Sequence, residues 1–216
     1  MRPMTFLSAA VLLLCCLTSC ISLKSEYPEI SYYNLQPIEP AQPVERPLDG
    51  VLLVRQFLSH AEYSGENILV SKDHNEVERL YYHRWVDEPA TLVSDMLVQR
   101  CLEADLFRGG VVQGASQVLP DYFVEGRVME LMAGEGRPPQ LEAVGDRVRG
   151  WATVRVHFSL VRIDAERSSR EVVLQRIYEY TAPRPNTNIA SIAPAVSMAA
   201  GNVVDKFIAD MASALR

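Results

Sequence analysis

The sequence predicts an α/β fold in which a mixed, largely antiparallel sheet is covered by two main helices. Three observations lead to this prediction. Residues 151–164 alternate between apolar and polar side chains, residues 172–181 follow as a partner strand, and two segments carry apolar residues at helical spacing. Because strands and helices follow one another in a mixed order, packing both helices on the sheet would bury the apolar faces of both.

The sequence of residues 51–85 predicts a buried strand followed by a hairpin. Residues 51–54 (Val-Leu-Leu-Val) form a short apolar run after the turn-prone pair Asp49 and Gly50. Residues 68–71 and 77–85 have strand composition, and residues 72–75 between them suit a turn. We therefore expect the two runs to pair.

A helix is predicted to begin at Pro89, because proline fits the first helical position. Its apolar residues fall at positions i, i+4, i+8 and i+11, which lie on one face of a helix, and they are Val93, Leu97, Cys101 and Ala104. We expect this helix to run to about Leu106 and to be stopped by Gly109 and Gly110.

The sequence from residue 122 to the C-terminus predicts three strands and a long helix. Residues 122–131 form a strand, and a Gly/Pro-rich loop follows over residues 133–150. Residues 151–164 and 172–181 then form a hairpin around the polar turn at residues 166–170. The C-terminal segment predicts one amphipathic helix whose apolar residues are Ile189, Ile192, Val196, Ala199, Val203, Phe207, Met211 and Leu215. The many Ala and Ser residues in its first half favour close packing on a sheet or helix rather than a membrane-lying helix.

The N-terminus carries a signal for export. Arg2 precedes an apolar run over residues 6–17, which is shorter than the roughly 20 apolar residues that a transmembrane helix needs. The run ends in Leu17, Thr18, Ser19 and Cys20. This tetrapeptide resembles the bacterial lipobox, which implies cleavage before Cys20, a diacylglyceryl group on its thiol and a third acyl chain on its amine. Three chains would anchor the protein almost irreversibly, since one chain binds a membrane only marginally.

The lipobox resemblance also suggests a destination. The residue after the cysteine is Ile21 rather than Asp, which resembles the default for sorting to the outer membrane of Gram-negative bacteria. An ordinary secreted protein that is cleaved nearby is the alternative interpretation.

The composition argues against a nucleic-acid-binding protein, a disulfide-linked protein and a zinc protein. The net charge is −6, and losing residues 1–19 with Arg2 would leave −7, so nucleic acid is not an expected partner. Cleavage would leave Cys101 as the only free thiol, which excludes an intrachain disulfide. The spacings typical of a zinc site are absent, and we expect neither a metal nor another cofactor beyond the covalent lipid.

The sequence predicts a division into three parts: a signal peptide over residues 1–19, a lipidated cysteine with a proline-rich tether over residues 20–49, and one domain over residues 50–216. Five prolines among polar residues favour an extended tether. Within it, residues 30–35 include two tyrosines and could dock as a strand.

No catalytic constellation emerges. Ser116 follows Gly114 by two residues but lacks the second glycine of a nucleophile elbow, because residue 118 is valine. The four histidines are scattered, so solvated loop residues explain His60 and His74 best. Cys101 lies on the apolar face of its helix, which favours a buried, inert thiol. Tyr178 and Tyr180 alternate with Ile177 and Glu179, so we expect one exposed tyrosine face as a partner surface.

The order of these elements, with several local strings, resembles the ABC-type transport auxiliary lipoprotein family, which includes the paraquat-inducible protein C lipoproteins. The matching pieces are the lipobox at Cys20, Tyr32-Tyr33-Asn34-Leu35-Gln36-Pro37, residues 75–85 with Pro89 to Phe107, Asp121-Tyr122 with Glu125-Gly126-Arg127, and the paired strands before the last helix. The resemblance implies a fold like that of the N-terminal domain of TolB. The loop over residues 133–150 is longer than this family leads us to expect.

The resemblance implies a non-enzymatic lipoprotein of the outer membrane that serves a lipid-handling ABC system. Its implied partners are the membrane, a periplasmic mammalian-cell-entry (MCE) type protein and ABC permease components. Association with further copies of the same chain is also possible. A regulator of a peptidoglycan synthase is an alternative, because similar lipoprotein domains act there. A lipid-modifying hydrolase is disfavoured by the missing catalytic groups, and a carrier that binds lipid in its own cavity stays open.

Overall fold

Strands dominate the part of the chain that the computed structural model describes, which is residues 28–37, 39–73, 76–114, 117–136, 138, 148–164 and 169–216. The strands are β1 (Ser31–Tyr33), β2 (Leu52–Val54), β3 (Leu58–Ser59), β4 (Asn67–Asp73), β5 (Glu76–Trp85), β6 (Val111–Gln113), β7 (Tyr122–Glu135), β8 (Gly150–Asp164) and β9 (Ser169–Arg184). The helices are α2 (Pro89–Glu103) and α3 (Ile192–Ala214), with short 3₁₀ helices η1 (Ala61–Tyr63) and η3 (Ile189–Ser191).

The described strands form one mixed sheet. Its longest pairings are antiparallel: β7 with β8, β8 with β9, and the β4–β5 hairpin. Parallel pairings join β4, β2 and β3 to β7, β6 to β2, and β1 to β5. The predicted fold class, a mixed and largely antiparallel sheet with two main helices, is confirmed.

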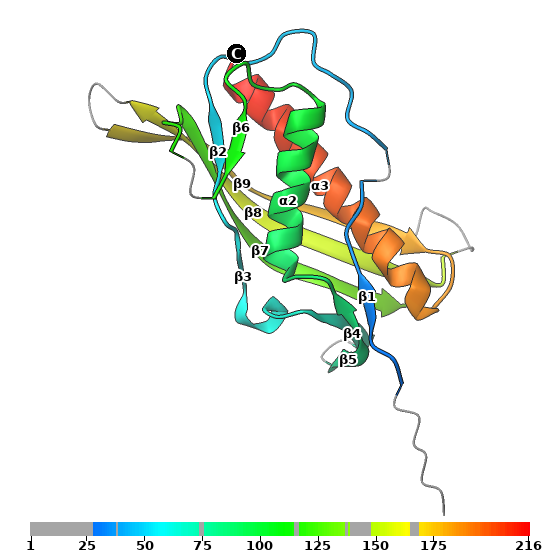
Figure 1. Cartoon of the computed structure of the whole chain (residues 1–216). Helices are drawn as coiled ribbons and strands as arrows, with labels where there is room; N and C mark the ends of the chain where they lie inside the picture. The colour runs from blue at the N-terminus through cyan, green and yellow to red at the C-terminus, as the bar shows by residue number, and fades with distance from the viewer. Residues whose placement is uncertain are drawn as a thin grey trace, which may run out of the picture.

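The two helices cover one face of the sheet (Figure 1). Helix α3 packs on β8 and β9, and α2 lies beside α3. At the centre of this contact, Phe207 of α3 stacks on Phe158 of β8 with ring centroids 4.3 Å apart. Tyr178 of β9 meets both rings edge-on, and the whole cluster is buried. Aromatic contacts of this kind add to the area that the rings bury, so they fix α3 on the sheet.

The alternation that predicts β8 is visible in its burial. Ala152, Val154, Val156 and Phe158 face the helices and have no exposed surface, whereas Arg155 and His157 on the opposite face are half-buried. The alternation therefore identifies the core face of this strand correctly.

Helix α3 contains the small residues of the C-terminal segment. Ala195, Ala199 and Ala200 are buried, which agrees with their expected role in close packing. Residues Ile189–Ala214 are long and apolar enough to cross a membrane by length and composition, but the apolar side of this segment lies on the sheet, as expected for a core helix.

Helix α2 ends earlier than the sequence predicts. Its last residue is Glu103, and Asp105 then takes a left-handed conformation with φ 48°. Gly109 has a different role from the predicted helix stop: its N–H donates to the carbonyl of Gly50 at 3.0 Å. A Cβ on Gly109 would lie 2.6 Å from that oxygen, so the close approach of the two backbones requires glycine.

The proline-rich segment departs from the prediction of a free tether up to residue 49. From Ser31 onward it lies on the domain: β1 pairs with β5, and Leu35 and Leu48 are buried. The predicted docking of residues 30–35 as a strand is confirmed by β1. Strand β7 also continues to Glu135, into the predicted loop over residues 133–150, and residues 137 and 139–147 of that loop lie outside the described residues.

Candidate functional site

The predicted lipidation residues Leu17, Thr18, Ser19 and Cys20 lie outside the described residues, so they stay predictions. His74 also lies outside them. Within the described ranges, no three His, Cys, Asp or Glu side chains gather in a way that could hold a metal ion.

Tyr178 does not belong to an exposed tyrosine face. It pairs with Val156 and Tyr180 pairs with Val154, so both tyrosines point toward the helices. Tyr178 is buried and donates a hydrogen bond to Asp210 Oδ2 at 2.8 Å, and burial raises its pKa above the ordinary value. Tyr180 keeps 39% of its surface exposed. Because β9 has apolar side chains on both faces, alternation alone does not show which face is buried.

Cys101 is buried, as predicted, and burial raises the pKa of its thiol to about 12. The thiol therefore stays protonated at physiological pH and is a poor nucleophile. His83 accepts or donates a hydrogen bond at Nδ1 with the Tyr33 hydroxyl at 2.9 Å, which joins β5 to β1.

The polar face of the sheet, opposite the helices, carries ion pairs. Arg155 lies 3.8 Å from Glu130 and 3.8 Å from Glu179. Burial raises the pKa of Glu130 even though Arg155 opposes the shift. Thr153 and Thr181 hydroxyls share a hydrogen bond of 2.8 Å across β8 and β9. These contacts are explained by cross-strand pairing.

The strap, which we define as residues 31–48 with Ile38 left out, is the feature that joins distant parts of the domain. It begins as β1 and then runs beside the helical layer (Figure 1). The Val44 N–H donates to the carbonyl of Ala104 at 2.8 Å, and the Leu48 N–H donates to that of Leu106 at 2.8 Å. Nearer β1, the Gln36 N–H donates to Ser197 Oγ of α3 at 3.1 Å.

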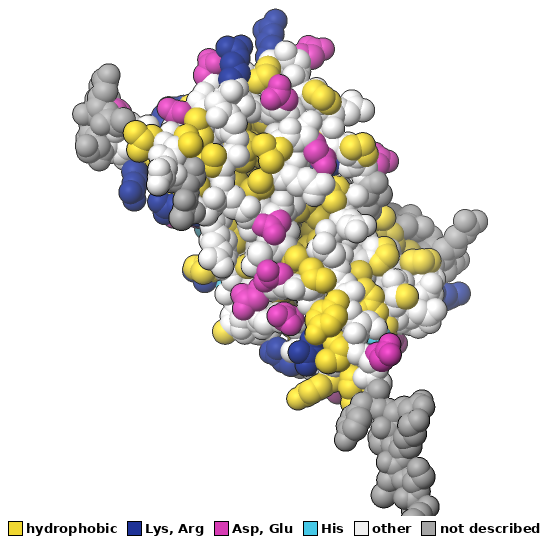
Figure 2. Space-filling model, viewed as in Figure 1, with side chains coloured by type: hydrophobic (Ala, Val, Ile, Leu, Met, Phe, Trp, Pro, Cys, Tyr) yellow, Lys and Arg dark blue, Asp and Glu magenta, His cyan; other side chains and the backbone are white. Residues whose placement is uncertain are grey.

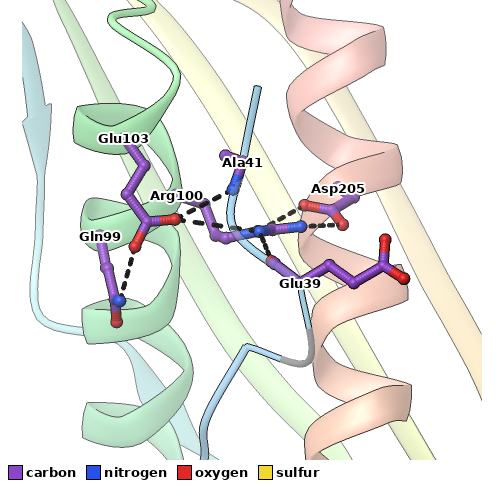
Figure 3. A network of polar contacts seen from close by, with 6 residues as sticks. All are labelled: Glu39, Ala41, Gln99, Arg100, Glu103 and Asp205. Atoms are coloured by element: carbon purple, nitrogen blue, oxygen red, sulfur yellow. Dashed lines mark hydrogen bonds and ion pairs between the residues drawn. The ribbon is translucent and has the colours of Figure 1, made fainter. Parts of the chain in front are cut away.

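A polar clamp, formed by Arg100, Glu103 and Asp205, holds the middle of the strap (Figure 3). Arg100 of α2 is 8% exposed and binds Asp205 of α3 through two hydrogen bonds, from Nε to Oδ1 and from Nη2 to Oδ2. Its Nη1 donates to the backbone carbonyl of Glu39 in the strap. The hydrogen bond with Asp205 raises the pKa of Arg100 further. One guanidinium thus joins two helices and the strap, which suits the planar fork of arginine.

Glu103 holds the next part of the strap. Its Oε2 accepts a hydrogen bond from the Ala41 N–H at 3.1 Å, and its Oε1 accepts one from Gln99 Nε2 at 2.7 Å. These two bonds, the first being the stronger cause, lower the pKa of Glu103 below its ordinary value. The ionised carboxylate therefore stabilises the docked strap.

An apolar cavity of about 790 Å³ lies between the strap, the end of β9 and the start of α3. Its walls include Tyr32, Tyr33 and Pro37 of the strap, Pro183 of β9, and Ala193 and Pro194 of α3. Small side chains leave this space open, and no Asp, Glu, Lys, Arg or His lines it. Figure 2 shows hydrophobic side chains gathered over β1 and the N-terminal half of α3.

A smaller, polar cavity of about 290 Å³ lies beside the apolar one and shares Pro37, Ser197 and Met198 with it. Glu39, Arg100, Asn202 and Asp205 also line it. The clamp therefore forms one wall of the polar cavity, and the strap borders both.

A family model described as ABC-type transport auxiliary lipoprotein component matches residues 33–208. The chain belongs to this family. The match begins inside the strap, so the strap is part of the family domain. The predicted family is thus confirmed. The family description implies an envelope lipoprotein with an auxiliary, non-enzymatic role in transport.

Solved structures agree with the fold. The protein resembles XCC0632 from Xanthomonas campestris with a TM-score of 0.68 and 16% identity, over 85% of this chain and 96% of that one. It also resembles CT253 from Chlamydia trachomatis with a TM-score of 0.51 and 10% identity, over 77% of this chain and 98% of that one. Identities this low show the fold alone. No curated protein matches the chain.

The clamp yields a prediction for Arg100. Arg100→Gln should release the middle of the strap and lower the free energy of unfolding by about 1.5–3 kcal/mol, the usual range for hydrogen bonds to charged groups. The lower half of this range is expected because the Asp205 side chain is 47% exposed and stays hydrated. Amide hydrogen exchange should accelerate at Ala41 and Val44. Arg46→Gln, an exposed strap residue, is the control; equal exchange in both variants would contradict the clamp.

The lowered pKa of Glu103 predicts how the stability of the fold depends on pH. Because the pKa of Glu103 is lowered in the folded protein, its charge stabilises the fold above its ordinary pKa of 4.5, and this stabilisation is lost as pH falls through the lowered value. Glu103→Gln should thus be less stable than wild type at pH 7 and equally stable at low pH. Urea unfolding between pH 7 and pH 3 measures this, with Glu45→Gln as control. A difference that does not change with pH would contradict it.

Proposed function

We propose that acyl chains on Cys20 hold this protein at the periplasmic face of the outer membrane, and that it serves a lipid-transporting ABC system as a docking or bridging component. The observation that carries the proposal is the combination of the lipobox with a family domain whose match begins thirteen residues after Cys20. The periplasmic partners would be an MCE-type protein and the ABC permease components.

The docked strap limits how far the domain reaches from its anchor. Ser31, the first residue paired in the sheet, follows Cys20 by eleven residues, which span at most about 40 Å when fully extended. The domain is therefore confined near the bilayer, which raises its effective concentration for partners at that membrane.

The short link between Cys20 and the domain argues against the alternative function, regulation of a peptidoglycan synthase. A regulator of a peptidoglycan synthase needs a tether that extends to the cell wall, and docking of residues 31–48 removes most of the length that the sequence offered for one. The family match, to a transport component, also favours the transport role.

Cys20→Ala tests the anchor. The variant should fold, since Cys20 precedes the family domain over residues 33–208, but it should leave the membrane fraction and appear in the soluble fraction of the envelope. Membrane fractionation with salt and carbonate washing measures this, and Cys101→Ala is the matched control. A Cys20→Ala protein that stays in the washed membranes would refute the anchor.

Gentle crosslinking in native membranes tests the partners. Affinity purification of the acylated full-length protein should recover MCE-type and ABC permease components, identified by mass spectrometry. Because the domain is tethered closely, the Cys20→Ala variant should recover them several-fold less efficiently. Recovery of a cell-wall synthase without transport components would overturn the proposal in favour of the alternative.

A further inference from the structure

The apolar cavity beside the strap has the size and chemistry of a binding site for hydrocarbon. Its volume of about 790 Å³ falls within the roughly 300–1,000 Å³ of typical ligand pockets. Its lining is mostly apolar and contains no charged side chain, so an ionic group that moved into it would give up part of its hydration without gaining a charged partner. A flexible apolar chain meets no such cost.

The cavity lies where the chain arrives from its anchor. Tyr32, which lines the cavity and is 58% exposed, follows Cys20 by twelve residues, or at most about 43 Å. Ile30, just before the strap, is 43% exposed. An amphipathic tyrosine next to an exposed isoleucine is the kind of surface that suits the boundary between water and lipid. The cavity is thus held within reach of the bilayer.

The polar cavity alongside indicates which lipids fit. Arg100 is already bound to Asp205, and Glu39 adds a further carboxylate, so the formal charge of this lining is −1. A fatty-acid carboxylate or an anionic headgroup would meet repulsion there. A zwitterionic headgroup, whose ammonium is compatible with these carboxylates, would not.

We propose that the apolar cavity takes one acyl chain of a zwitterionic phospholipid from the bilayer that holds the anchor. This inference rests on the anchoring proposed above and adds a lipid site in the domain itself. The strap supplies one wall of the site and α3 supplies the other, with the headgroup toward Glu39 and Asp205.

Photolabelling tests the site. Acylated full-length protein is placed in phosphatidylcholine vesicles that contain phosphatidylethanolamine with a diazirine in one acyl chain, and adducts are mapped by mass spectrometry after irradiation. Adducts are expected in residues 31–37 and 190–198. Ala190→Trp, which fills the cavity from an exposed position in η3, should reduce them at least five-fold. Pro185→Trp fills it from the position just after β9 and serves as a second variant.

Ala61→Trp is the matched control, because Ala61 is also an exposed alanine in a three-residue 3₁₀ helix and does not line the cavity. Equal labelling in Ala61→Trp and in both cavity variants would overturn the proposal. Crosslinks from residues 31–37 or 190–198 to a second copy of the chain, in place of lipid, would overturn it and assign the cavity to self-association.

The Cys20→Ala chain separates this proposal from the anchor. The variant receives the same photoactivatable lipid in detergent micelles. In a separate assay it is mixed with the vesicles used above, and if it still sediments with them, the anchor proposal fails. If micellar lipid does not label residues 31–37 and 190–198, the cavity proposal fails. Labelling in Cys20→Ala together with none in the acylated protein would also overturn the cavity proposal, since the protein's own acyl chain would then be the occupant.

Discussion

The stack of Phe207 on Phe158 is the contact on which the rest of the site depends. It seats α3 on the long β7–β8–β9 meander, and a helix is rigid enough that fixing one turn fixes its neighbours. Asp205 lies two residues before Phe207 and is thereby presented to Arg100 of α2. Ser197, further along the same helix, is presented to the strap. The packing of these two rings thus sets the position of the polar clamp.

The clamp in turn makes the proline-rich segment part of the folded domain rather than a free tether. Composition alone favours an extended tether, because prolines and polar residues cannot build a core. Here the backbone of that segment is satisfied by the domain instead: Glu103, Ala104 and Leu106 accept its N–H groups. Docking of this segment shortens the distance that the domain can move from its anchor and keeps the domain closer to the membrane. A transport component whose partners meet it at the membrane gains from this, because a short link keeps the domain concentrated there.

Periodicity predicted the elements that carry much apolar surface, and it failed where a few residues decide the outcome. The alternation in β8 and the apolar face of α3 were readable because each extends over many residues. Strands β3 and β6 and helix η1 have two or three residues each, too few to show a period. The clamp joins residues 105 positions apart, which no local pattern encodes. A signal was nevertheless present: Arg100 lies seven residues after Val93, on the apolar face of α2, and a charge there predicts a buried partner.

The apolar cavity exists only while the strap is docked, because Tyr32, Tyr33 and Pro37 form one of its walls. Pairing of β1 with β5 fixes the two tyrosines, and the hydrogen bonds of Arg100 and Glu103 fix the chain just beyond Pro37. The cavity proposed for lipid and the proline-rich segment are therefore built in part from the same residues. A strap that was free to extend the anchor's reach would remove this wall, whereas the docked strap completes a cavity that stays open to solvent on one side. On the two proposals above, the same contacts would hold the domain near the bilayer and complete a pocket for one of its lipids.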